Sequence, residues 1–215
     1  MTSHTILQTT RLRLREFNSG DLASLTQMHR DPRVCALLVD DYPLHDTNSA
    51  LAFIAALGRI YRSHEGFGIW HSECLVDGRW LPCGWFYLLP LDVADCNDTS
   101  EAEIGCRLLP QHWGTGLALD GGQLLLAHAF ESLALSRVLG LCHPNNRSVK
   151  LTLLTLGFQP RAERDYGGQR ASQFVMDAAQ WRATGGQARR LRTRQALHAL
   201  RTLEIEAEAP SNLHR

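Results

Sequence analysis

The segment from Glu103 to Ala118 constrains the fold most, because it joins a strand to a helix through two closely spaced glycines. The strand ends at Pro110, and the helix begins within the turn Gly114-Thr115-Gly116. Glycines let a backbone approach a ligand with no Cβ in the way. The first N–H groups of a helix lack partners within the helix, and with the helix dipole they can bind a diphosphate. The segment therefore predicts either a phosphate cradle or an ordinary tight turn.

Two common phosphate-binding motifs are excluded. No G-x-x-x-x-G-K-[ST] run occurs in the chain, so it lacks a P-loop. The G-x-G-x-x-G of dinucleotide-binding folds would need a glycine at position 119, where the chain has Leu119. A Gly-x-Gly turn on its own is often no more than a tight turn. The rest of the sequence is therefore needed to distinguish a phosphate site from an ordinary turn.

The remaining sequence alternates between strand and helix patterns. Period-two alternation and short apolar runs predict strands over residues 10–17, 67–76, 82–91, 101–109, 137–142, 158–164 and 173–176. Apolar positions at helical spacing predict helices over residues 22–29, 48–63, 116–134 and 146–156. Asp77-Gly78 is typical of a hairpin turn. The order predicts an α/β fold (an α+β mixed sheet), antiparallel at first, with a parallel crossover near the middle.

Length and composition indicate one domain of ordinary size and exclude several classes of protein. The chain has 215 residues and a formal net charge of zero, so neither nucleic acid nor an anionic membrane is an expected partner. No stretch approaches the ~20 apolar residues of a membrane span, and residues 1–8 lack a signal pattern, so we expect a cytoplasmic protein. The six cysteines include no C-x-x-C pair, and no H-E-x-x-H or Cys/His cluster occurs, so no metal is expected.

The run from Gln111 to Gly116 fits the Q/R-x-x-G-x-G/A acyl-CoA loop of the GNAT superfamily. The wider segment resembles the branch that includes the bacterial ribosomal-protein N-terminal acetyltransferases, through Glu103, Ile104, Gly105, Leu108, Pro110, Trp113, Gly114, Gly116 and Ala118. The likeness extends to Thr10-Arg11-Leu12-x-Leu14-Arg15 with Asp21, to Phe67–Ile69 with Gly84, and to Leu156-Gly157-Phe158. It covers about residues 8–180, the expected GNAT-like acyltransferase domain, and leaves residues 181–215 as an Arg-rich C-terminal helical tail.

The resemblance implies a splayed mixed sheet, flanked by helices, that holds acetyl-CoA as co-substrate between two parallel strands. The implied cofactor-binding residues are Leu108, Leu109, His112, Trp113, Gly114, Thr115, Gly116, Leu117, Ala118 and Asn146. Backbone groups near Leu108 and Leu109 would pair with the pantetheine amides, and those from His112 to Ala118 would hold the pyrophosphate. The implied reaction is acetylation of a primary amine, on a protein or peptide N-terminus or a small molecule, by direct attack in a ternary complex.

This reaction needs a base for the ammonium group, an oxyanion stabiliser and a proton donor for the leaving thiolate. Glu103 is the first candidate for the base, because the branch often has glutamate there and strand alternation places it on one face with Gly105 and Arg107. The competing interpretation is an exposed glutamate paired with Arg107. For His112 we expect a role of the backbone rather than of the ring, and we expect Trp113 to pack as core behind the turn.

The late helix departs from the family pattern, which has N-x-x-S ahead of the L-G-F run. Counting back from Phe158 without a gap puts Asn146 on the motif asparagine and Val149 on the serine. A one-residue slide would put Asn145 and Ser148 there instead, and it would rotate each side chain by about 100°. We favour the ungapped register. Ser148 remains the second catalytic candidate, and its competing role is a serine that bonds its own helix backbone.

The tyrosine that many superfamily members use to protonate the thiolate falls on Leu153, which can donate no proton. Together with Val149 at the serine position, this residue motivates an alternative function. The chain would then be a non-catalytic acyl-CoA-binding or assembly module on the same fold.

Two further segments bear on partners. The tail carries Arg189, Arg190, Arg192, Arg194 and Arg201, followed by Glu204, Glu206 and Glu208. Because its acidic end cancels a nucleic-acid patch, we expect a helix that docks on its own domain or on the second subunit of a homodimer. A peptide substrate would suit an acidic groove, and the acidic side chains of the polar loop could line it: Asp92, Asp95, Asp98, Glu101 and Glu103.

Overall fold

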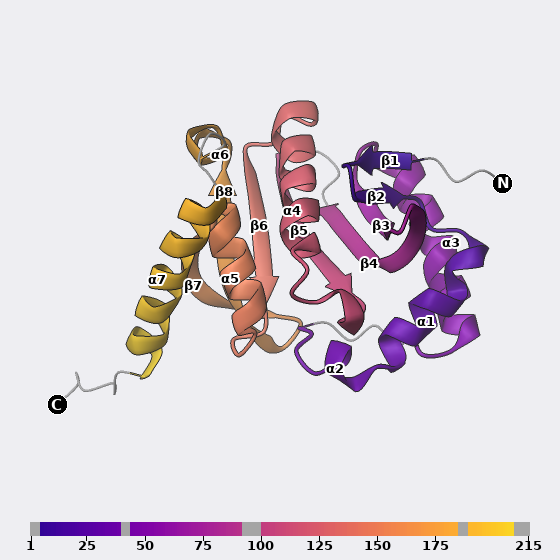
Figure 1. The fold of residues 1–215 in the computed structure, drawn as a ribbon, viewed down its shortest axis with the longest axis horizontal. Coiled ribbons are helices and arrows are strands. Elements are labelled where there is room, and N and C mark those ends of the chain that lie inside the picture. The colour runs from indigo at the N-terminus through magenta and orange to yellow at the C-terminus, as the bar shows by residue number, and fades with distance from the viewer. Residues whose placement is uncertain (1–4, 40–43, 92–99, 185–188, 209–215) are drawn as a thin grey trace.

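The computed structural model describes residues 5–39, 44–91, 100–184 and 189–208. An eight-stranded sheet with the order β1-β2-β3-β4-β5-β6-β8-β7 forms its centre (Figure 1). The strands are β1 (Thr5–Gln8), β2 (Leu12–Arg15), β3 (Gly68–Val76), β4 (Arg79–Pro90), β5 (Glu101–Leu108), β6 (Arg137–Cys142), β7 (Gln159–Tyr166) and β8 (Gln169–Asp177). β5 and β6 are parallel, and the other neighbouring pairs are antiparallel. The predicted mixed sheet with one parallel crossover is confirmed.

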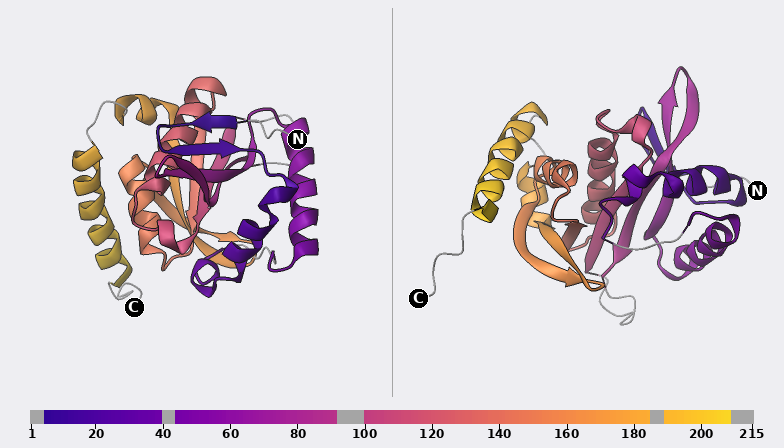
Figure 2. Two further views of the ribbon diagram at one scale, coloured as in Figure 1. Left: turned by 45° about the vertical axis from the view of Figure 1, so that its right-hand side comes forward. Right: turned by 90° about the horizontal axis from the view of Figure 1, so that it is seen from below.

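Helices flank both faces of this sheet. They are α1 (Leu22–Arg30), α2 (Pro32–Cys35), α3 (Thr47–Ser63), α4 (Leu117–Ala127), α5 (Arg147–Leu156), α6 (Ala178–Thr184) and α7 (Arg189–Glu208). α4 contacts β2, β4 and β5, and α5 contacts β6 and β7. α1 contacts β4 and α3 contacts β3. These two helices lie on the opposite side of the sheet from α4 and α5 (Figures 1 and 2). Each helix in the described part of the chain is too short or too polar to span a membrane.

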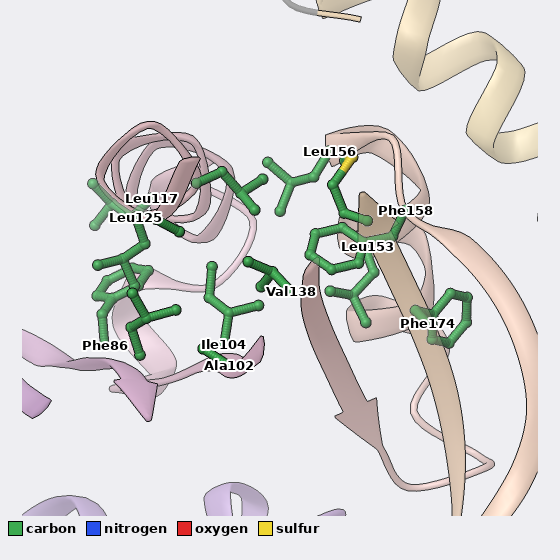
Figure 3. Packing of buried hydrophobic residues seen from close by; sticks show 14 of the residues in the cluster. Phe86, Ala102, Ile104, Leu117, Leu125, Val138, Leu153, Leu156, Phe158 and Phe174 are labelled. Atoms are coloured by element: carbon green, nitrogen blue, oxygen red, sulfur yellow. The ribbon is translucent and has the colours of Figure 1, made fainter. Parts of the chain in front are cut away.

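Two apolar clusters lie on the two sides of the sheet, as neighbouring residues of β4 illustrate. Phe86 belongs to the cluster with α4 and α5, whereas Trp85 belongs to the cluster with α1 and α3. Figure 3 shows Leu117 and Leu125 of α4 close to Phe86. Gly121 permits this approach, because a Cβ there would lie only 2.1 Å from the Phe86 ring. α4 therefore packs closely on the strand that precedes β5.

The structure differs from the predicted elements mainly where distant residues meet. The helix predicted over 116–134 ends at Ala127 and continues as a π-helical turn, His128–Ser132. In this turn the His128 ring lies 2.8 Å from the Gly66 carbonyl oxygen, a contact that local periodicity does not reveal. β1, α2 and α6 are absent from the predicted elements. The Asp77-Gly78 turn has φ values of 48° and 76°, as a tight hairpin requires.

The tail helix α7 packs along α5 (Figure 1). Ala196 and Leu200 are almost fully buried and join the cluster that contains α5. Across the two helices, Arg147 Nε donates to Glu204 Oε1 at 2.7 Å. The tail thus docks on its own chain. α6 spans the predicted boundary between domain and tail at residue 180, so no break in secondary structure marks that position. The division into a domain and a tail stays a prediction.

Candidate active site

The loop between β5 and α4 has the geometry of an anion cradle. After the short turn η2 (Pro110–His112), Gly114 and Gly116 both have left-handed φ values, of 73° and 83°. α4 begins at Leu117, and no side chain caps its N-terminus, so no capping side chain accepts a hydrogen bond from its first N–H groups. A Cβ added to Gly114 would meet nothing within 4 Å, so the space beside the loop is open. Both the backbone and the space fit a diphosphate.

Arg11 is a site residue that sequence reasoning missed. Its Nε donates to Asp120 Oδ2 at 2.5 Å, and its Nη2 donates to the Thr115 carbonyl oxygen at 3.0 Å. The Thr115 hydroxyl in turn donates to the His112 carbonyl oxygen at 2.7 Å. Arg11 therefore fixes the loop and neutralises a carboxylate in the first turn of α4 that would repel an anion. Its only signal in the sequence is its place in the Thr10-Arg11-Leu12 run.

The two side chains ahead of the glycines are both held by neighbouring strands. His112 Nδ1 lies 3.7 Å from the Cys74 sulfur, and burial lowers the pKa of His112, although a bond to the Pro82 carbonyl opposes this shift. Trp113 is 47% exposed, and its Nε1 donates to the Leu108 carbonyl oxygen at 2.8 Å. The prediction that Trp113 packs as core is wrong, because the indole bonds a carbonyl at the strand end instead of entering the core.

β5 leaves much of its β6 side unpaired. The two strands pair through three residues at the start of each and then separate. The Ser100 carbonyl accepts from Ser136, on the β6 side, whereas the Glu101 carbonyl accepts from Leu91, on the β4 side. Because the direction of backbone groups alternates along a strand, the even-numbered residues of β5 direct theirs toward β6.

This alternation identifies the open edge residue by residue. Beyond the paired part, the backbone groups directed toward β6 belong to Ile104, Cys106 and Leu108. The Leu109 N–H instead donates to the Cys83 carbonyl oxygen at 2.9 Å, on the β4 side. The Leu108 carbonyl already accepts the indole N–H described above. Sequence reasoning therefore missed Ile104 and Cys106, which counting the alternation along the strand would have found.

The Glu103 side chain lies on the face of the sheet that α1 and α3 cover, opposite to the face that carries α4 and α5. The Tyr87 hydroxyl donates to Glu103 Oε1 at 2.7 Å. Arg107, on the same strand face, is 7% exposed; its Nη1 bonds His29 Nε2 at 2.8 Å and its guanidinium lies over the Trp85 ring. Glu103 and Arg107 are four residues apart, about 13 Å along a strand. Each has a partner of its own, in contrast to the direct Glu103–Arg107 pair of the competing interpretation.

His29 is buried as a neutral side chain above this face. Its Nδ1 lies 3.0 Å from the Leu25 carbonyl oxygen, which can only accept a hydrogen bond. Its Nε2 then accepts from Arg107, so both ring nitrogens are satisfied without a second proton. Burial, together with the charge of Arg107, lowers the pKa of His29 to about 4.

Asn145 and Asn146 have different positions at the start of α5. Asn146 is the N-cap, and its Oδ1 accepts from the Val149 N–H at 3.2 Å. Asn145 and Ser148 are both exposed. Leu153 is 6% exposed and belongs to the apolar cluster shown in Figure 3. A Cβ on Gly140 of β6 would lie 2.6 Å from the Leu153 side chain. Five residues turn a helix by about 140°, so Ser148 lies on a different side of α5 from Leu153.

Comparison with known proteins identifies the family. The sequence profile of the acetyltransferase (GNAT) domain matches residues 11–159. The uncharacterized N-acetyltransferase p20 of Bacillus licheniformis is 33% identical over 166 residues, which are 74% of this chain and 86% of that protein. The FsC-acetyl coenzyme A-N(2)-transacetylase of Aspergillus fumigatus is 28% identical over 137 residues, 62% of this chain. The chain spans only 56% of the length of that relative.

A solved structure supports the same fold. The ribosomal L7/L12 alpha-N-protein acetyltransferase RimL, solved in complex with coenzyme A, superposes with a TM-score of 0.64 at 14% identity. The superposition covers 81% of this chain and 98% of RimL. Its name agrees with the branch that the sequence resembles. On the family match and these likenesses, the chain belongs to the GNAT family of acetyltransferases and is an acyl-CoA-dependent N-acetyltransferase.

Proposed function

We propose that this enzyme transfers an acetyl group from acetyl-CoA to a primary amine by direct attack in a ternary complex. The observation that carries the proposal is the position of Glu103. The pairing of β5 with β6 ends at Glu103 and Leu139, so the carboxylate lies where the two strands part. From that point the open edge of β5 leads to the glycine loop, about 17 Å away along the strand.

The residues of this chain divide the binding of acetyl-CoA between two backbone surfaces. The open edge at Ile104, Cys106 and Leu108 would pair with the pantetheine amides in the manner of an added strand. The N–H groups of the glycine loop and of the first turn of α4, from Gly114 to Ala118, would hold the diphosphate. Asn146 would contribute its side-chain amide from the start of α5. When bound, acetyl-CoA supplies the thioester carbonyl that the amine attacks.

Glu103 would perform the proton transfer that makes the amine reactive. An alkyl ammonium must lose a proton before its nitrogen can attack, and a positioned carboxylate can accept it directly or through a water. The proton for the departing sulfur would come from Ser148 or from a water. Leu153 cannot supply it, because its side chain is apolar and lies within the core.

A second candidate function rests on that same leucine. Leu153 and Val149 contribute apolar groups to the core where many family members have polar ones. A protein that binds acyl-CoA without turning it over would account for both residues. Three of the acidic residues expected to line a groove for a peptide substrate, Asp92, Asp95 and Asp98, lie outside the described residues.

Release of free thiol from acetyl-CoA, measured with a panel of small amines and N-terminal peptides, tests the proposal. An N-acetyltransferase releases thiol with at least one acceptor, whereas a non-catalytic module releases none. Glu103→Gln should keep the affinity for acetyl-CoA and lose turnover, most strongly at low pH, where the amine is mainly protonated. The exposed Glu65 provides the matched control, and Glu65→Gln should leave turnover unchanged. Normal turnover of Glu103→Gln at every pH would remove this carboxylate from the reaction.

A further inference from the structure

Tyr87 reaches Glu103 from the neighbouring strand. In the register of β4 with β5, Tyr87 pairs with Gly105, and Leu89 pairs with Glu103. The tyrosine therefore does not lie opposite the glutamate. It extends diagonally across Gly105, and its hydroxyl donates to Glu103 Oε1 at 2.7 Å. Diagonal neighbours across an antiparallel pair are about 7–8 Å apart, a distance that a tyrosine side chain can bridge.

Gly105 forms the slot through which this contact is made. A Cβ at position 105 would lie 2.4 Å from the ring carbons and from the hydroxyl oxygen of Tyr87. No side chain can share that space with a rigid ring, so the ring keeps its place only while residue 105 is glycine. On its other side Tyr87 packs with the apolar cluster under α1 and α3. The ring is thus held from both sides, and its hydroxyl meets the carboxylate at one end.

We propose that Tyr87 is a positioning residue for Glu103, and that Gly105 is the slot that makes this possible. The inference rests on the proposed function, in which Glu103 is the base. The hydroxyl restrains the orientation of the carboxylate, so less freedom is lost when the substrate ammonium binds. Its hydrogen bond also favours the charged form of the carboxylate. Both effects keep Glu103 ready to accept a proton.

A purely structural role for the tyrosine predicts different behaviour. Phenylalanine would fill the same apolar space, and the fold would keep its stability and its pH dependence of turnover. A positioning role requires the hydroxyl itself. The pH profile of kcat/KM separates the two roles, because packing alone does not move it.

The test compares Tyr87→Phe with the wild type and with Tyr166→Phe, a control on β7, three strands away from β5. We expect kcat of Tyr87→Phe to fall about tenfold with little change in KM. We also expect the acid limb of the kcat/KM profile to move up by about one pH unit. Gly105→Ala keeps the hydroxyl but displaces the ring, and it should move the acid limb in the same direction. Tyr166→Phe should match the wild type.

A double variant shows whether Tyr87 acts through Glu103. In the Glu103→Gln background, Tyr87→Phe should cause little further loss, because coupled residues are not additive. An independent, full-sized loss there would overturn the inference. So would an unchanged kcat and pH profile in Tyr87→Phe alone while the wild type is active. A wild type that acetylates no acceptor refutes the proposed function itself, and the inference with it. The acetyl-CoA-induced rise in melting temperature confirms folding of each variant.

Discussion

Gly105 and Gly114 lie nine residues apart, and the structure requires glycine at each for a different reason. At Gly105 a side chain is excluded by close contact, since its Cβ would collide with the Tyr87 ring. At Gly114 nothing is close, but φ is 73°, a conformation that side chains disfavour. The first glycine therefore makes room for the Tyr87 ring beside Glu103, and the second gives the proposed cofactor loop its backbone conformation. Substitutions at the two positions should affect different measurements.

Gly114→Val should abolish the rise in melting temperature that acetyl-CoA gives the wild type. A ligand that binds only the folded state stabilises it by mass action, by about 2.7 kcal/mol at a hundredfold excess over Kd. The valine side chain would fill the open space that the diphosphate is proposed to occupy. Thermal unfolding with and without acetyl-CoA measures the effect.

Gly167 offers a matched control for this variant. It lies in the turn between β7 and β8, with φ of 60° and nothing within 4 Å of an added Cβ. Either valine should destabilise the unliganded protein by roughly 1–2 kcal/mol through backbone strain. Gly167→Val should nevertheless keep the full response to acetyl-CoA. If Gly114→Val kept it as well, the loop could not be the diphosphate site.

At the level of the element, the two ends of α5 bear on which asparagine faces the cofactor. Asn146 caps the first turn of the helix. At the other end, the N–H groups of Gly157 and Phe158 both donate to the Leu153 carbonyl oxygen, and Gly157 has φ of 104°. This left-handed glycine closure fixes where the helix stops. A helix fixed at both ends leaves little room for the extra residue that the shifted register needs, which favours Asn146 over Asn145.

We therefore predict that Asn146→Ala weakens binding of CoA and that Asn145→Ala has little effect. Asn146→Ala also removes the N-cap, which should cost about 1 kcal/mol of stability. Asn146→Ser separates the two roles, because serine restores the cap without the amide. It should regain the stability and keep the weakened affinity, as measured by thermal unfolding and titration calorimetry. Recovery of affinity in Asn146→Ser would reduce Asn146 to a cap.

The shifted register makes the opposite prediction for the same helix. Asn145 and Ser148 would then act together, because residues three apart lie on one helical face. Both Asn145→Ala and Ser148→Ala should in that case impair turnover. In the ungapped register the exposed Ser148 contributes little, and Ser148→Ala should turn over at close to the wild-type rate. A large loss in a folded Ser148→Ala would establish the shifted register.

For the whole molecule, the order of elements could be predicted because each strand or helix carries its period in its own residues. β6 is an example, since it is predicted and observed over the same six residues, Arg137–Cys142. The pairings that build the candidate site could not be predicted in this way. Tyr87 meets Glu103 only because β4 and β5 pair in a particular register. Arg11 meets Thr115 only because α4 packs against β2, which brings the residue ahead of β2 to the loop ahead of α4. Hydrophobic pattern specifies which face a residue occupies, but not its diagonal neighbour on the next strand.

Two buried histidines link the stability of the whole molecule to pH. His29 and His71 are 3% and 1% exposed, and burial lowers the pKa of each to about 4. Their neighbours differ in sign. His71 Nε2 lies 3.7 Å from the Asp21 carboxylate, which favours the charged imidazole, whereas His29 bonds the guanidinium of Arg107, which opposes it. We therefore expect the clearer pH dependence from His29.

Stability should fall as the pH drops from about 6.5 toward about 4, because the unfolded chain binds a proton at His29 that the folded chain excludes. Above this window both states hold a neutral imidazole, and His29 contributes no slope. Within it, one such histidine gives about 1.4 kcal/mol per pH unit, about 3 kcal/mol in all. Urea unfolding between pH 4 and 7 measures the slope. His29→Gln, whose amide can still accept from Arg107, should reduce the slope by about 1.4 kcal/mol per pH unit. His198→Gln, at an exposed position of α7, should leave the slope unchanged. An equal slope in His29→Gln and the wild type would mean that His29 binds its proton as readily in the folded protein as in the unfolded chain.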